Sequence, residues 1–189
     1  MVRYLGFLLL PFILVAQAYA LEDPGSALSS QDVSIQPILG NKVDLDLTFT
    51  DSFGEQASLR EMSIQGRPMM FVPVYYSCPR LCGLVLDGVS ALLNKLSLSL
   101  GTDYQVMVVS FDPREGPDLA QKRRAHYLER LKLDSADNGW RFLVGGEQNV
   151  TALMKQLGFN YVKDGNEYAH GSAIILLTPD GEISQYFTG

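Results

Sequence analysis

Apolar runs of strand length alternate with stretches of helical periodicity along this chain, and the alternation limits the folds open to it. Uninterrupted or alternating apolar runs predict strands over residues 43–50, 69–76, 104–110, 140–144, 173–178 and 182–187. Helical spacing predicts helices from about residue 79 onward, over 117–131 and over 149–157. The last two strands form a hairpin around Pro179-Asp180-Gly181, so this order predicts an α/β fold with a mixed central sheet flanked by helices.

Two details of these predicted elements concern packing. Pro73 lies inside the strand over 69–76, where it removes one backbone donor, so we expect a bulge or a sheet edge there. In the first helix we expect one apolar face, made of Leu84, Val85, Val89, Leu92, Leu93, Leu96 and Leu100.

Composition indicates an ordinary globular domain that does not bind nucleic acid. The chain has 189 residues, about one domain's worth, of which 47% are hydrophobic and 19% charged. Its formal net charge of −6 is opposite in sign to that of proteins that contact nucleic-acid phosphates. The basic run Lys122-Arg123-Arg124 is therefore expected to be a solvated helix face.

The first twenty residues have the pattern of a signal peptide. Arg3 precedes an apolar run over residues 5–16, and Ala18-Tyr19-Ala20 supplies the small residues of a cleavage site. A membrane-spanning helix needs roughly 20 apolar residues, and the run over residues 5–16 is shorter than that. We therefore expect cleavage after Ala20, with an uncleaved inner-membrane anchor as the alternative. Export predicts a periplasmic location, where disulfides persist.

The domain prediction follows from the same features. Residues 1–20 are the signal peptide or anchor, the polar stretch 21–42 is a leader, and residues 43–189 form the folded domain. The sequence stops directly after its last strand, so we expect this domain to be truncated at its C-terminus.

The two cysteines, Cys78 and Cys82, lie at a strand-to-helix junction. Residues four apart share a helix face, with Cβ atoms about 5–6 Å apart, which suits a disulfide, a redox pair or half of a metal site. A disulfide would close a loop of only three residues and gain little entropy. Pro79 suits the first helical turn, which places Cys78 at the positive end of the helix, where a thiolate is stabilised. Two thiolates with one imidazole suit copper, and also zinc.

Only two histidines could complete a metal site. His126 lies in KRRAHYLER, a charged helix face, and is expected to be solvated. His170 lies in YAHGSAIILL, in a loop directly before a buried strand. We therefore take His170 as the candidate third ligand.

Three segments carry a resemblance to a known family. They are CPRLC (78–82), VVSFDPRE (108–115) and YAHGSAIILLTPDG (168–181). In order and spacing they resemble the Sco (SenC) proteins, thioredoxin-fold copper-binding proteins that help to assemble cytochrome c oxidase, over about residues 47–189. The resemblance implies a thioredoxin-like fold, in which the loop that carries His170 faces the start of the cysteine helix. It also implies that Cys78, Cys82 and His170 bind one copper ion, with Asp112 as a conformational or weak fourth partner.

The sequence departs from the family pattern around the site. Arg80 and Gly83 replace an acidic residue and a proline in and after the cysteine motif, and Ala169 replaces an acidic residue before the histidine. These departures concern the surroundings of the site more than its ligands.

The resemblance implies a copper carrier rather than a turnover enzyme. Its partners would be the copper-bearing subunit of cytochrome c oxidase and other copper chaperones. The alternative is a thiol–disulfide oxidoreductase that reduces the cysteines of the oxidase copper site, with Cys78 and Cys82 as its catalytic redox pair. A peroxide-reducing enzyme is a third hypothesis, but no threonine precedes Cys78 to activate it.

Overall fold

The computed structural model describes residues 33–79, 81–132 and 139–189. The predicted signal peptide, and with it most of the predicted leader, lies outside the described residues. Within these ranges, no helix is both long enough and apolar enough to cross a membrane.

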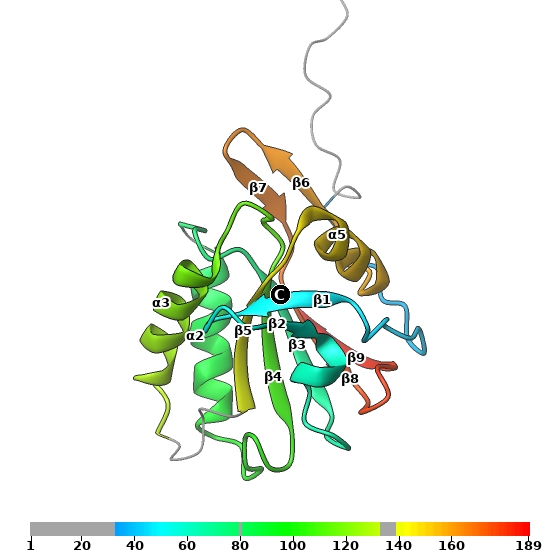
Figure 1. Ribbon diagram of the computed structural model, residues 1–189, viewed down its shortest axis with the longest axis vertical. Helices are drawn as coiled ribbons and strands as arrows, with labels where there is room; N and C mark the ends of the chain where they lie inside the picture. Colours follow the sequence, from blue (N-terminus) through cyan, green and yellow to red (C-terminus); the bar gives the residue numbers. More distant parts are fainter. Residues whose placement is uncertain (1–32, 80, 133–138) are drawn as a thin grey trace, which may run out of the picture.

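A seven-stranded mixed sheet forms the centre of the molecule (Figure 1). In spatial order its strands are β2 (Gln56–Ser58), β1 (Thr48–Asp51), β5 (Trp140–Val144), β4 (Gln105–Ser110), β3 (Met69–Val74), β8 (Ala173–Leu177) and β9 (Ile183–Thr188). The pairs β3–β4 and β4–β5 are parallel, whereas β1 pairs with β5 and β8 with β3 in antiparallel fashion. The predicted mixed α/β sheet with its final β8–β9 hairpin is confirmed.

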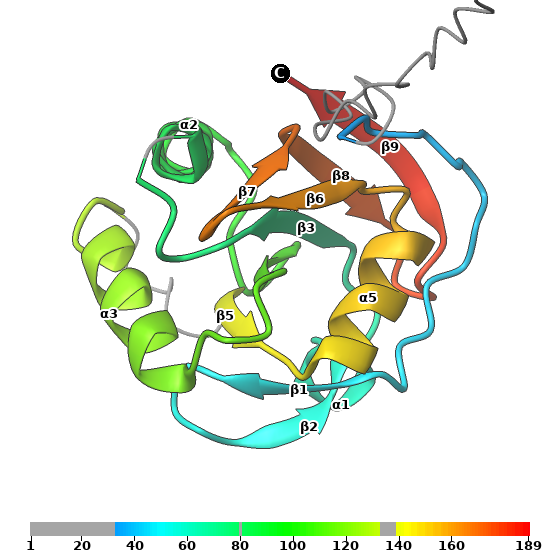
Figure 2. The same cartoon turned by 90° about the horizontal axis from the view of Figure 1, so that it is seen from above.

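Helices cover both faces of this sheet (Figure 2). The helices α2 (Leu81–Leu93) and α3 (Pro117–Leu128) lie on one face, and α5 (Glu147–Gln156) lies on the other. A single turn, α1 (Leu59–Met62), follows β2 and begins with a capping box between Ser58 and Glu61. Every residue of β3 and β4 is buried, as expected of central parallel strands covered on both faces.

Pro73 sits in a central strand, not at a sheet edge. Its register with β4 runs without a bulge from Met69 to Val74. The partner strand β8 pairs only with the first three residues of β3, ending at Phe71. Pro73 therefore lies beyond the β8 pairing, where its missing N–H removes no bond to that strand.

The predicted strand over 43–50 is too long, although its pattern of burial is right. Val43, Leu45 and Phe49 are buried, but the strand itself covers only Thr48–Asp51. The side chain of Asp44 accepts a hydrogen bond from the Asp46 N–H, which turns the backbone before the strand begins. Alternation in this segment reports burial rather than strand pairing.

The predicted apolar face of the first helix is partly wrong. The buried residues of α2 are Cys82, Leu86, Val89, Ser90 and Leu93. Leu84 is 69% exposed and Leu92 38% exposed. The helix also ends at Leu93, so Leu96 and Leu100 belong to the following segment.

Among the described residues, four short elements were not predicted, namely β2, α1 and the two strands of a hairpin. The strands β6 (Tyr161–Asp164) and β7 (Glu167–His170) form a separate antiparallel hairpin above the end of the sheet from which α2 begins (Figure 1). His170 is therefore the last residue of a strand, not part of a loop. The Asp164-Gly165-Asn166 turn, with aromatic residues on both sides, is the sequence signal for this hairpin.

Candidate metal centre

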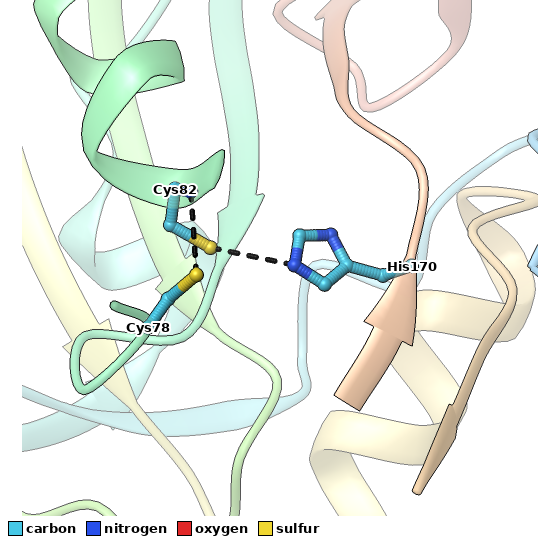
Figure 3. Close-up of side chains that lie close together, drawn as sticks. All are labelled: Cys78, Cys82 and His170. Carbon is cyan, nitrogen blue, oxygen red and sulfur yellow. Dashed lines mark hydrogen bonds between the residues drawn. The ribbon is translucent and has the colours of Figure 1, made fainter. Parts of the chain in front are cut away.

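The turn between β3 and α2 brings the two cysteines together (Figure 3). The Cys78 N–H donates to the Tyr75 carbonyl at 3.2 Å, which closes the turn before the helix. The Cys82 N–H then donates to Cys78 Sγ at 3.4 Å, so Cys78 lies against the first turn of α2. The helix begins at Leu81, however, so Pro79 precedes it and does not occupy its first turn as predicted. The two cysteines are not joined by a disulfide; Cys78 is partly exposed and Cys82 is buried.

Each sulfur thus accepts a backbone hydrogen bond. Cys82 Sγ accepts one at 3.4 Å from the N–H of Tyr75, the residue that directly follows β3. Donors directed at sulfur stabilise thiolate character. Burial has the larger effect on Cys82, however, and raises the pKa of its thiol well above the ordinary value.

His170 approaches the cysteines from the β6–β7 hairpin. Its Nε2 lies 3.7 Å from Cys82 Sγ. Its Nδ1 lies 2.6 Å from the Gly171 carbonyl, which requires the proton to be on Nδ1 and leaves the Nε2 lone pair directed at the sulfur. Burial lowers the pKa of His170, and the hydrogen bond to Gly171 raises it by less, so the ring is neutral near pH 7.

One cluster of metal-ligating atoms results. Cys78, Cys82 and His170 each offer one ligand atom, and the three atoms lie within 4.8 Å of one another. A histidine that donates its second N–H to a backbone carbonyl is the usual arrangement at a protein metal site. These are the three candidate ligands named from the sequence, and the structure places them together.

Aromatic rings pack against the imidazole of His170. The ring centroids of Tyr75 and Phe111 lie 5.6 Å and 5.1 Å from that of His170, both close to edge-on. Phe111 also contacts Tyr168 at 5.6 Å, edge to face. This packing fixes the plane of the imidazole and keeps water from one side of it.

The comparisons with known proteins agree with this geometry. A sequence model of the SCO1/SenC family matches residues 36–189. The chain belongs to the SCO1/SenC family. No curated protein sequence matches it significantly.

Solved structures of similar fold include members of this family. A candidate electron transfer protein of Aquifex aeolicus superposes with a TM-score of 0.71 at 25% identity, covering 80% of this chain and 85% of the other. ScoI of Arabidopsis thaliana with copper bound gives 0.63 at 14% identity, covering 80% and 88%. BsSco, from a family of cytochrome c oxidase assembly proteins and described as having a disulfide switch, gives 0.61 at 22% identity, covering 82% and 86%.

Asp112 of this SCO1/SenC chain does not join the cluster of ligand atoms. The residue is 2% exposed, and its carboxylate accepts bidentate hydrogen bonds from the Arg114 guanidinium at 2.6 and 2.8 Å. Burial alone would raise the pKa of Asp112, but the hydrogen bonds from Arg114 outweigh it and lower that pKa. Asp112 therefore acts through its neighbours rather than as a ligand atom in this arrangement.

Those neighbours hold the hairpin that carries His170. The Tyr168 hydroxyl donates to Asp112 Oδ1 at 3.2 Å. Arg114 donates to the Asn166 carbonyl at 3.1 Å, and its guanidinium lies 5.4 Å from the centre of the Tyr168 ring. Sequence analysis missed both residues, because only the fold brings the segment VVSFDPRE against the hairpin.

The basic run on α3 also departs from its prediction as a solvated face. Arg124 is buried, and its Nε donates to the Trp140 carbonyl at 3.2 Å. Arg123 donates to the Tyr76 carbonyl at 2.7 Å, close to the cysteine turn. His126 is exposed as predicted and contacts only the Tyr127 ring among the described aromatic groups.

Proposed function

We propose that this protein is a copper-binding assembly factor for cytochrome c oxidase that holds one copper ion through Cys78, Cys82 and His170. The observation that carries the proposal is the convergence of two sulfurs and one imidazole nitrogen within 4.8 Å. Membership of the SCO1/SenC family and the similarity to copper-bound ScoI support it.

The donor atoms fit copper in both kind and spacing. Thiolates are soft ligands that favour Cu(I), and imidazole is a good ligand for copper and also for zinc. Metal–ligand bonds of about 2.0–2.3 Å put two donors of a trigonal site roughly 3.5–4 Å apart. The 3.7 Å between Cys82 Sγ and His170 Nε2 falls in that range.

Loading the site requires proton release from this chain's own residues. The high pKa of the buried Cys82 thiol means that the ion must displace its proton, whereas neutral His170 already presents a free lone pair. Cu²⁺ would call for a further oxygen or nitrogen donor. Asp112 is engaged by Arg114 and Tyr168, so water or a partner protein is the better source of that donor.

The second candidate function is reduction of the oxidase cysteines. It is favoured by the unequal burial of the two thiols, because a partly exposed Cys78 can attack a client disulfide while buried Cys82 completes the exchange. The client disulfide would be reduced to two thiols as Cys78 and Cys82 became a disulfide. This function needs both thiols but not His170.

Location and partners follow from the proposed function. The signal-peptide pattern of residues 1–20 supports action in the periplasm, either free or anchored to the inner membrane. The recipient of the ion would be the copper-bearing subunit of cytochrome c oxidase, with other copper chaperones as possible donors.

Replacement of each histidine separates the two functions. His170→Ala removes one ligand of three. Loss of a residue that merely hydrogen-bonds to a ligand costs about 10–100-fold in metal affinity, so loss of the ligand itself should cost at least as much. The Cys78–Cys82 disulfide should still form and be reducible in this variant. The measurements are copper affinity by competition titration and the thiol–disulfide potential of the reduced and oxidised protein.

His126→Ala is the matched control, because it removes an exposed imidazole on α3. It should change neither property. Unchanged copper affinity in His170→Ala would remove the histidine from the site and favour the oxidoreductase.

A further inference from the structure

The turn between β3 and α2, which carries Cys78, is held by a carboxylate from another part of the chain. Tyr76 and Ser77 follow β3 and directly precede Cys78. Glu115, between β4 and α3, accepts from the Tyr76 N–H through Oε2 and from the Ser77 N–H through Oε1, both at 2.7 Å. Two successive N–H groups thus converge on one carboxylate, an arrangement that suits an anion.

Two other contacts hold the same turn. We call the hydrogen bonds that Glu115 and Arg123 make to the Tyr76–Ser77 peptide the clamp. The Ser110 hydroxyl donates to Glu115 Oε2 at 2.6 Å, which fixes the carboxylate against the end of β4. Arg123 on α3 donates to the Tyr76 carbonyl at 2.7 Å. The peptide group between Tyr76 and Ser77 is therefore held at both ends, its oxygen by Arg123 and its N–H by Glu115.

Cys78 depends on such a clamp more than Cys82 does. Cys82 lies within α2, where helical hydrogen bonds fix its backbone, whereas Cys78 precedes the first helical residue, Leu81 (Figure 3). Along the turn, the Cys78 N–H donates to the Tyr75 carbonyl and Cys78 Sγ accepts from the Cys82 N–H. The position of Cys78 Sγ relative to the other two donor atoms is thus set by the turn.

We propose that Glu115, together with Arg123, positions Cys78 for metal binding by clamping the Tyr76–Ser77 peptide. The proposal rests on the proposed copper site and assigns that site a residue that touches no ligand atom. Hydrogen bonds to an ionised acceptor are shorter and stronger than neutral ones, and the three contacts of Glu115 at 2.6–2.7 Å have that character.

Glu115→Gln tests the clamp with little change of shape. The variant keeps one oxygen acceptor and replaces the other by an NH₂ group, which cannot accept from a backbone N–H. In the reduced domain we expect copper affinity to fall about 10–100-fold, as for other residues that orient ligands, and the thiolate-to-Cu²⁺ charge-transfer band to shift. Arg123→Gln should move both readouts in the same direction by loosening the carbonyl end of the same peptide.

Asp118→Asn is the matched control. Asp118 is an exposed carboxylate in the first turn of α3, so the variant makes the same change in net charge away from the turn. It should leave copper affinity and the charge-transfer band unchanged. An equal loss of affinity in Asp118→Asn would mean that charge, not positioning, is responsible, and would overturn the proposal.

Hydrogen exchange of the Ser77 amide tests the clamp without metal. Ser77 is exposed, so its N–H should exchange at least 10-fold faster once Glu115 no longer accepts from it. If the unaltered domain binds no copper, the proposed function fails. Positioning of Cys78 by Glu115 is then still supported if Glu115→Gln shows faster exchange of the Ser77 amide together with a changed rate of Cys78 alkylation. Unchanged exchange, or faster exchange with unchanged copper affinity in a copper-binding domain, overturns the proposal.

Discussion

His170 presents one ring nitrogen to Cys82 because its other nitrogen donates to the Gly171 carbonyl. The same imidazole is packed edge-on against Tyr75 and Phe111. The hydrogen bond fixes its tautomer, and the aromatic packing fixes its ring plane. A neutral, oriented imidazole needs no proton release before it can bind a metal ion.

The lowered pKa of His170 predicts a pH dependence of stability in the reduced, metal-free domain. An unfolded histidine titrates near pH 6.5, whereas burial keeps folded His170 neutral to lower pH. As pH falls below about 6.5, the unfolded chain therefore takes up a proton that the folded chain does not, and folding stability declines until the folded pKa is passed. Urea unfolding between pH 7.5 and 4.5 should show a smaller decline in His170→Gln than in the unaltered domain.

His126→Gln is the control for that series, since it alters an exposed ring on α3. It should retain the decline of the unaltered domain. Identical pH profiles for His170→Gln and the unaltered domain would show that His170 is as easily protonated in the folded state as in the unfolded one.

The β6–β7 hairpin is the element that delivers His170, and Arg114 fastens it to the β4–α3 loop. Arg114→Ala removes the bond to Asn166 and leaves Asp112 buried without its charged partner. We expect about a 10-fold loss of copper affinity, because the third ligand becomes less well oriented, together with a lower melting temperature. Competition titration and thermal unfolding of the same samples measure both.

Arg130→Ala is an unusually close control for Arg114→Ala. Arg130 also pairs with a carboxylate, Asp87, and also lies 5.4 Å from the centre of a tyrosine ring, that of Tyr127, but it lies in the turn after α3 rather than beside the hairpin. It should leave copper affinity unchanged. If the two variants lost copper affinity equally, the hairpin contact would not be what orients His170.

The sequence was sufficient for the central strands but not for the elements around them. β3 and β4 are wholly buried, so their apolar runs stand out and were predicted to within two residues at each end. The hairpin was missed because its strands have four residues each and are only half buried, which leaves little periodicity to detect. The buried face of α2 was misjudged because leucines such as Leu84 are exposed there, and hydrophobicity alone does not say which face packs.

The candidate site, too, could be predicted from the sequence only in part. Cys78, Cys82 and His170 could be named from residue type and spacing, because few residues in the chain are soft metal ligands. Arg114, Tyr168, Glu115 and Arg123 could not, because their roles depend on hydrogen bonds between segments that are more than 30 residues apart. Polar residues of that kind are common on surfaces, and only the fold distinguishes these from the rest.

At the scale of the whole molecule, three segments meet at the end of the sheet from which α2 begins (Figure 1). The β3–α2 turn carries the cysteines, the β6–β7 hairpin carries the histidine, and the β4–α3 loop contacts both through Glu115 and Arg114. Ligands of open α/β sheets gather in this kind of crevice, beyond the carboxyl ends of parallel strands. The sheet thus supplies a rigid base, and the loops supply the chemistry.

The number of copper ions bound by the whole domain in its two redox states tests the central claim most directly. Cys78 and Cys82 are the only cysteines in the chain, so a single disulfide removes both thiolates at once. The reduced domain should bind one copper ion per chain with a thiolate-to-metal charge-transfer band, and the oxidised domain should bind essentially none. Equal binding by the two forms would show that the thiols are not ligands and would contradict the account.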